Sequence, residues 1–269
     1  MSWDAVLIGT TSPSASLAEA LIHWLSSAPL WQIVPAILAE NFVVHGVALA
    51  LGEAAARRFR HRRVAPPAPP LCRGEVVMAT VTLLTNSLTT LIGLYLWRLG
   101  VIRFRTGLEV WAALDVVLLL LVMDGAMYVL HRAAHLPWIY PWLHRSHHEH
   151  DRPRPLTLFI LNPLENLAFG ALMLAVFALH PFSWLAMAIF VVFNIASGII
   201  GHLGVEPLPD WWVRVPVVRC LTGGSFHARH HQDVQANFGF YTVIWDRLFR
   251  TLRRDYWKRF GQLPEETEG

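Results

Sequence analysis

Long apolar segments without charges constrain this chain more than any other feature. Residues 76–97 form a run of 22 residues with no charged side chain, and a helix of that length rises about 33 Å, enough to cross the hydrocarbon core of a bilayer. Further apolar segments cover residues 110–130, 156–180 and 184–200, and a longer one with polar interruptions covers residues 21–51. Hydrophobic residues make up 54% of the chain and charged residues 15%, with a mean hydropathy of +0.41. We therefore predict an all-α integral membrane protein, a bundle of about four to five membrane-spanning or hairpin helices.

Histidines gather where the third of these segments ends. Residues 124–150 contain six of the fourteen histidines. In a helix, His131 and His135 share one face with Asp124 and Tyr128, because residues three or four apart lie on the same side. A second helical face follows shortly afterwards, at positions i, i+3 and i+4: His144, His147 and His148.

The same triplet recurs late in the chain as His227, His230 and His231, and His202 stands alone after an apolar segment. Neutral imidazole is a good ligand for iron, zinc, copper or nickel. A single HxxxH pair is more often two satisfied or surface histidines, so the repetition is what favours a metal site. Nine candidate ligands exceed the roughly four to six that one ion takes, which indicates two metal ions.

Basic residues predict the orientation of the chain in the membrane. Residues 57–63 carry five arginines ahead of a proline-rich connector, and the positive-inside rule puts this loop in the cytoplasm. Under that topology only three of the 22 basic residues lie on the opposite side, namely Arg98, Arg103 and Arg105. All the histidine groups then lie together, and we expect them to form a cytoplasmic, histidine-rich cap.

Other features narrow the compartment and the partners. The chain has 21 arginines and one lysine, a bias typical of GC-rich genomes, which favours a bacterial inner membrane, or the endoplasmic reticulum membrane in a eukaryote. No basic stripe interleaved with aromatic residues is present, so nucleic acid is not an expected partner. Cys72 and Cys220 share no metal-binding spacing. Asp4 and the absence of an early basic region argue against a cleaved signal peptide.

These motifs resemble those of the fatty acid hydroxylase and sterol desaturase superfamily of integral-membrane di-iron enzymes. The matching pieces are DGAMYVLHRAAH, WLHRSHH, FHARHH and WDRLFRT, with NFG after the last histidine group. The resemblance covers about residues 115–251. It implies that nine residues bind two iron ions: His131, His135, His144, His147, His148, His202, His227, His230 and His231. It also implies O2 as co-substrate and the hydroxylation or desaturation of a lipid such as a fatty acyl chain, a sphingoid lipid or a sterol.

Three further residues are candidates for tuning the site. Asp124 lies inside an apolar segment, where an ionisable residue is costly and usually functional, and we predict that it orients a histidine. Tyr128 shares the helix face of His131 and His135. Asn237 follows the last histidine group and is expected to form a hydrogen bond near it. We therefore add these three residues to the predicted catalytic site.

The resemblance implies an O2-dependent oxidoreductase that takes its lipid substrate from the bilayer. No electron carrier is visible in the sequence, so we expect a separate donor of the cytochrome b5, ferredoxin or reductase type. The expected organisation is N-terminal membrane helices with the basic and proline-rich loop in residues 1–108, the histidine-box domain in 109–251 and a polar tail in 252–269. Two alternatives are a metal transporter, whose site would lie nearer the bilayer midplane, and a non-catalytic scaffold that holds structural metal.

Overall fold

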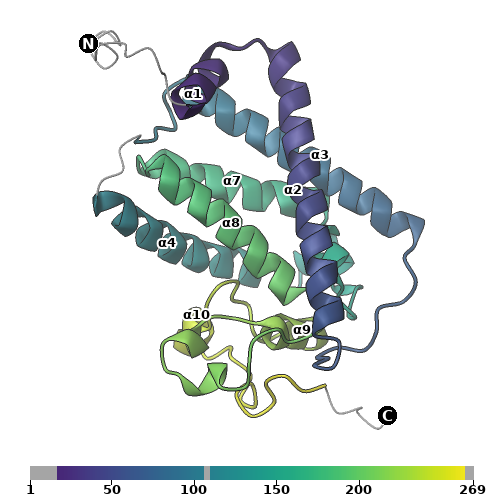
Figure 1. Ribbon diagram of the computed structural model, residues 1–269. Helices are drawn as coiled ribbons and strands as arrows, with labels where there is room; N and C mark the ends of the chain where they lie inside the picture. Colours follow the sequence, from purple (N-terminus) through teal and green to yellow (C-terminus); the bar gives the residue numbers. More distant parts are fainter. Residues whose placement is uncertain (1–16, 106–109, 264–269) are drawn as a thin grey trace.

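The computed structural model describes residues 17–105 and 110–263, and in these ranges the chain folds into apolar helices with a polar cap at one end (Figure 1). The longer helices are α1 (Leu17–Ser27), α2 (Leu30–Arg58), α3 (Arg73–Arg98), α4 (Val110–Ala134), α7 (Pro163–Leu179) and α8 (Trp184–Gly201). The shorter ones are α5 (Tyr140–Leu143), α6 (Arg145–His148), α9 (Gly224–Gln232) and α10 (Ile244–Leu248), with 3-10 turns at Pro155–Phe159, Trp212–Arg214 and Val218–Cys220. The described residues contain no β-sheet, so the all-α prediction is confirmed.

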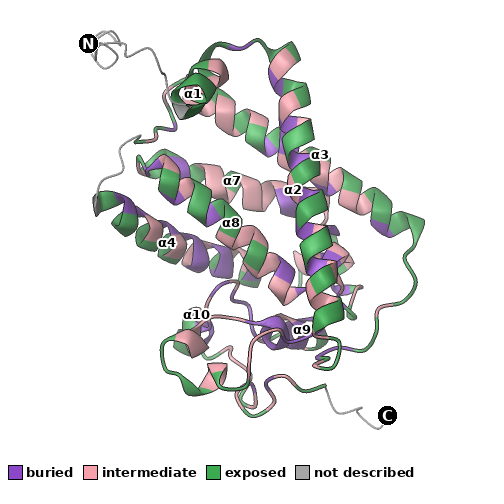
Figure 2. Cartoon of the chain, viewed as in Figure 1, coloured by how far each residue is buried: buried purple, intermediate pink, exposed green. Residues whose placement is uncertain are grey.

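Within the described ranges, four helices are long and apolar enough to cross a membrane: α2, α3, α4 and α8. In each of them no more than 33% of the most apolar stretch is buried inside the protein, and Figure 2 shows exposed positions running along α2 and α3. Apolar side chains that face outward over such lengths are stable in lipid and costly in water. Helix α7 is apolar but has only 17 residues. The structure thus agrees with the predicted membrane bundle.

The first predicted segment, residues 21–51, is two helices rather than one. It breaks at Pro29, which has φ −71° and ψ 159° and precedes the first residue of α2. Proline lacks the N–H that would continue α1, and it disfavours helical geometry in the residue before it. The free backbone carbonyls at the end of α1 find a hydrogen-bond donor on α3. The Arg98 guanidinium donates to the carbonyls of Leu25 at 2.6 Å and Ala28 at 2.8 Å.

Helices α3 and α7 run side by side in the same direction, and glycine makes their close approach possible. A Cβ atom at Gly170 would lie 2.6 Å from Thr89 Oγ1, and one at Gly93 would lie 2.9 Å from a methyl group of Leu174. Helix pairs in membranes are stabilised by packing at such small residues, because lipid competes for every apolar contact. This contact fixes where α7 begins, and α7 begins at the functional site.

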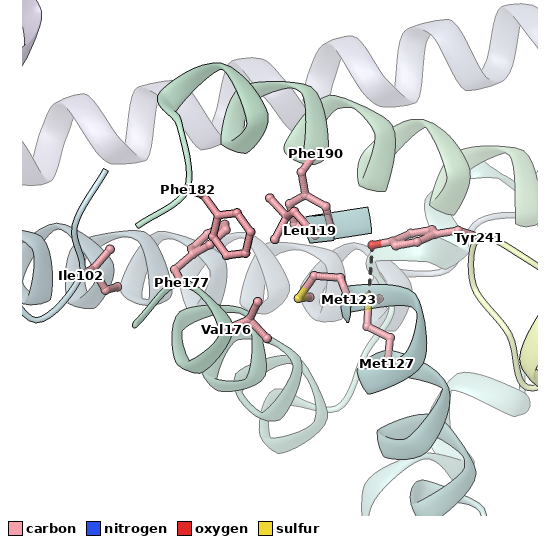
Figure 3. Close-up of a cluster of buried hydrophobic side chains, with 9 residues drawn as sticks. All are labelled: Ile102, Leu119, Met123, Met127, Val176, Phe177, Phe182, Phe190 and Tyr241. Atoms are coloured by element: carbon pink, nitrogen blue, oxygen red, sulfur yellow. Dashed lines mark hydrogen bonds between the residues drawn. The ribbon is translucent and has the colours of Figure 1, made fainter. Parts of the chain in front are cut away.

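An apolar cluster fills the space between α4, α7 and α8 (Figure 3). Its buried members are Ile102, Leu119, Met123, Met127, Val176, Phe177, Phe182, Phe190 and Tyr241. Tyr241 comes from the C-terminal region and lies at the end of the cluster nearest the cap, where its hydroxyl donates to Asn194 Oδ1 at 2.6 Å. The cap is therefore anchored in the bundle core by one of its own aromatic rings.

The cap packs directly on the bundle and includes part of the predicted polar tail. The ring of Trp245 lies where a side chain at position 125 would be, since a Cβ at Gly125 would be 2.7 Å from it. Tyr256 and Phe260 are buried in a cluster with Phe226 and Val243. Tyr256 and Phe260 thus pack part of residues 252–263 against the cap, whereas residues 264–269 lie outside the described ranges.

We expect Gly170→Ala to destabilise the protein, because the added methyl group would overlap Thr89 and force α3 and α7 apart. Overpacking of this kind costs about 1–3 kcal/mol in the free energy of unfolding. The matched control is Gly46→Ala on α2, where no atom lies within 4 Å of the added Cβ. Thermal unfolding in detergent measures the difference, and equal melting temperatures for the two variants would contradict the proposed packing.

Candidate metal centre

The structure brings all nine predicted histidines together, in two clusters where the bundle meets the cap. The first cluster consists of His131, His135, His144, His148 and His230. The second cluster consists of His147, His202, His227 and His231. Within each cluster, one candidate ligand nitrogen from every residue lies within 4.8 Å of all the others. Seven of the nine residues are buried, and His135 and His227 are partly buried, so the clusters are internal sites and not surface patches.

Each short histidine helix contributes to both clusters. In the 144–148 segment the i and i+4 residues belong to the first cluster, and His147 between them belongs to the second. In α9 the arrangement is reversed: His227 and His231 belong to the second cluster, and His230 belongs to the first. Residues i+3 and i+4 are about 100° apart around the helix axis, so they lie on opposite flanks of the face that contains residue i. Two short helices can therefore build two adjacent sites.

Backbone carbonyls fix the ring orientation of four of these histidines. In each case the Nδ1–H donates to the carbonyl, which can only accept, so the proton is on Nδ1 and Nε2 carries a free lone pair. The pairs are His131 with Phe238, His147 with Ile160, His202 with Gly198, and His230 with Ala236, at 2.7 to 3.1 Å. Outer partners of this kind are what orient metal-binding histidines.

The unprotonated nitrogens face one another. His147 Nε2 and His202 Nε2 lie 3.2 Å apart, although the proton of each ring is on Nδ1. His131 Nε2 and His144 Nε2 lie 3.0 Å apart in the first cluster, and there Glu165 accepts the Nδ1–H of His144 at 2.6 Å. Two lone pairs at this distance repel each other, whereas a cation between them is attracted to both. The donor atoms therefore fit a metal ion in each cluster.

Further ring nitrogens of the clusters are buried and have no hydrogen-bond partner among the described residues: His135 Nε2, His148 Nδ1, His230 Nε2 and His231 Nδ1. Burial lowers the pKa of His202 to about 4. Burial, together with the neighbouring imidazoles, also lowers the pKa of His227 and His231 well below the usual value. The rings are thus neutral at neutral pH, the form that binds metal, and an all-nitrogen set suits ions such as iron or zinc.

Glu165 is a site residue that the sequence pattern did not reveal. It lies in the first turn of α7, its side chain is 2% exposed, and its Oε1 accepts from the buried His144. A carboxylate behind a metal-binding histidine fixes the tautomer and raises the basicity of the ring. The sequence did contain one indication of its role, because an acidic residue in an apolar segment is usually functional. Glu165 is 21 positions after His144, and a separation of that size is not a helical spacing that would indicate a contact between them.

Asp124 does not orient a histidine as predicted. Its buried carboxylate accepts from the backbone N–H groups of Tyr241 at 3.0 Å and Thr242 at 3.2 Å, from the Thr242 hydroxyl, and from Trp245 Nε1 at 3.0 Å. The prediction fails because α4 turns this side chain toward the C-terminal segment and not toward the clusters. Asp124 therefore acts on the cap and not on a ring nitrogen.

The other two predicted tuning residues also contact the C-terminal region. The Tyr128 hydroxyl lies 3.0 Å from Thr251 Oγ1, and its ring stacks on Phe249 with centroids 5.4 Å apart. Asn237 Nδ2 donates to the carbonyl of Phe226 at 3.1 Å, directly before the third histidine group, so the hydrogen bond expected there is observed. Both residues therefore contact the C-terminal region and form no hydrogen bond with a ring nitrogen of the clusters among the described residues.

The profile of the family described as fatty acid hydroxylase matches residues 116–251, about half of the chain. The chain belongs to the fatty acid hydroxylase family. The part that carries this membership contains all nine clustered histidines, Glu165, Asp124 and Asn237. The recognition made from the histidine motifs is thereby confirmed.

Individual relatives of this fatty acid hydroxylase family member are named as lipid-modifying enzymes. It is 28% identical over 131 residues to a Delta(7)-sterol 5(6)-desaturase of Leptosphaeria maculans, covering 49% of this chain and 35% of the relative. It is 31% identical over 134 residues to methylsterol monooxygenase 1 of Danio rerio, covering 48% and 44%. It is 31% identical over 159 residues to a very-long-chain aldehyde decarbonylase of Oryza sativa subsp. japonica, covering 56% and 25%. The chain thus spans less than half the length of these relatives. No solved structure matches it.

We expect Glu165→Gln to weaken metal binding at the first cluster by about tenfold or more, because the neutral amide no longer raises the basicity of His144. The matched control is Glu149→Gln, since that carboxylate is exposed and forms a salt bridge with Arg145, one turn earlier in the chain. Competition between the purified protein and a chelator for cobalt(II) measures both affinities. Equal affinities in the two variants would show that Glu165 does not support the cluster.

Proposed function

We propose that this chain is a membrane-bound di-iron oxidoreductase that uses O2 to hydroxylate or desaturate a lipid. The observation that carries the proposal is the pair of buried histidine clusters at the end of an apolar helical bundle. Family membership adds to it, since the relatives include proteins named as sterol desaturases and a methylsterol monooxygenase. Nine neutral imidazoles without a thiolate are a donor set for redox-active iron and differ from the closed, cysteine-rich sets of many structural zinc sites.

The chain's own residues would bind and orient two ions. Iron, when bound, would supply O2 activation and the oxidising power for an unactivated C–H bond, which side chains lack. The carbonyls of Phe238 and Ala236 hold His131 and His230, so that their Nε2 lone pairs point into the first cluster. Glu165 keeps the proton of His144 on Nδ1. Hydroxylation places one oxygen atom in the product and releases the other as water, which consumes two electrons and two protons from a donor.

Aromatic rings lie next to the histidines of the first cluster. The Phe240 ring lies 5.0 Å from the ring of His131 and 5.4 Å from the ring of Phe169 on α7. The Phe238 ring lies 5.2 Å from that of His135. An apolar approach of this kind suits the hydrocarbon part of a fatty acyl chain, a sphingoid lipid or a sterol, and it favours a substrate that arrives from the bilayer.

We also propose that the clusters face the cytoplasm. The arginine-rich loop after α2 contacts the cap, since Arg62 donates to the carbonyls of Glu206 and Leu208, and the positive-inside rule puts such a loop on the cytoplasmic side. A separate donor of the cytochrome b5, ferredoxin or reductase type would deliver electrons there. In this proposal residues 109–251 form the catalytic domain, set on the helices of 1–108, in a bacterial inner membrane or the endoplasmic reticulum.

Metal content tests the proposal first. We expect the full-length protein, purified in detergent without oxygen, to contain about two irons per chain, and we expect His147→Ala to lose the ion of the second cluster. His150→Ala is the matched control, because His150 lies in the same stretch but outside both clusters. Mass spectrometry measures the metal, and product analysis after addition of O2, a reductant and candidate lipids measures turnover.

Two results would contradict the proposal. A single tightly held zinc without O2 consumption would indicate a structural scaffold. Transfer of metal ions across a liposome membrane by the purified protein would indicate a transporter.

A further inference from the structure

One short segment orients histidines of the first cluster and none of the second. The carbonyl of Ala236 accepts from His230 Nδ1 at 2.7 Å, and the carbonyl of Phe238 accepts from His131 Nδ1 at 2.8 Å. Both histidines belong to the first cluster. The carbonyls that orient histidines of the second cluster come from other elements, Ile160 after the 3-10 turn and Gly198 on α8.

Asp246 holds this segment from the side of α10. Its carboxylate is completely buried and accepts from the N–H groups of Phe238 and Gly239, both at 2.8 Å, and from the Thr251 hydroxyl at 2.6 Å. The N–H of Phe238 and its carbonyl are parts of one residue, so a displacement of the first moves the second. Asp246 therefore acts on His131 through a single residue of backbone.

Asp124 holds the same segment from the side of α4. It accepts from the N–H groups of Tyr241 and Thr242 and from the indole N–H of Trp245. Residues 238, 239, 241 and 242 are thus all tied by their backbone N–H groups to one of two buried carboxylates. Because each carboxylate accepts several hydrogen bonds, the backbone between them is fixed.

The backbone itself leaves little room for another conformation. A Cβ atom at Gly239 would lie 2.4 Å from the carbonyl oxygen of Thr242 and 2.8 Å from Asp246 Oδ2, so only glycine fits there. Asn237 has φ +60°, a left-handed geometry that asparagine tolerates, and its Oδ1 accepts from the N–H of Arg253 at 3.0 Å. The segment is therefore a rigid element and not a loop free to adapt to the ring positions.

We propose that residues 236–242, held by Asp124 and Asp246, position the first metal ion alone, and that Asp246 is a positioning residue for that ion. The inference rests on the proposed function in one respect, that both clusters bind metal. Without the Asp246 contacts, the carbonyls of Ala236 and Phe238 are no longer held in position. The Nδ1–H groups of His230 and His131 then lose the acceptors that point their Nε2 atoms into the first cluster. The second cluster keeps its own carbonyls and should retain its ion.

The test is the number of cobalt(II) ions bound by the full-length protein in detergent, after removal of its native metal. We expect the unaltered protein to bind about two ions per chain. We expect Asp246→Asn to bind one ion, whose visible absorption is unchanged, and the double variant Asp246→Asn with His202→Ala to bind none. The matched control is Asp255→Asn, which lies in the same C-terminal region but pairs with Arg253 and Arg259. It should bind two ions.

Two outcomes would overturn the inference: two ions with an unchanged spectrum in Asp246→Asn, or loss of both ions in a variant that still elutes as a single folded species. If Asp246→Asn does not fold, Asp124→Asn releases the other end of the segment and is judged by the same two results. If the unaltered protein binds fewer than two ions, the proposed function is refuted and the inference falls with it. If the unaltered protein binds two ions and only the variants give a contrary result, the positioning role alone is refuted.

Discussion

Unprotonated imidazole nitrogens that point at one another, out of reach of water, determine how this protein has to be built. Five rings have their Nδ1 protons taken by four carbonyls and one carboxylate, so their Nε2 atoms cannot donate. A buried polar atom without a partner costs about 1–3 kcal/mol, and facing lone pairs add repulsion. Packing elsewhere must therefore hold the rings in place, and bound cations would stabilise the folded state by mass action.

That packing comes from two sources that meet at α4. On the lipid side, the apolar cluster between α4, α7 and α8 holds the three helices together, and the Asp115 carboxylate on α4 accepts from the Ser183 N–H at the start of α8. On the cap side, Trp245 covers Gly125 and Tyr241 inserts beside Met127. Helix α4 is thus apolar over most of its length and carries His131 in its last turn. The site lies where the bundle ends because only there can a membrane helix meet a polar segment.

Much of this could be predicted from the sequence, because it depends on local patterns. Length and hydropathy alone predict membrane helices, and spacings of three and four residues predict shared histidine faces. The division of the histidines between the two clusters could not be predicted: His147 and His148 are adjacent in the chain, yet they belong to different clusters, because each cluster is completed by histidines from other elements. Glu165 and Asp124 met partners 21 and 117 or more residues away, which no periodicity encodes.

The shared use of α9 has a consequence for how the protein is made. Each cluster takes at least one ligand from residues 227–231 and others from residues before 203. Neither site has its complete set of donors until translation has passed the last histidine and α8 has been inserted in the membrane. A ribosome-bound chain with its first four helices already in lipid would present histidines without their partners. Under the proposed function, metal would therefore be loaded late in maturation, and loading would require that the cap has docked on the bundle.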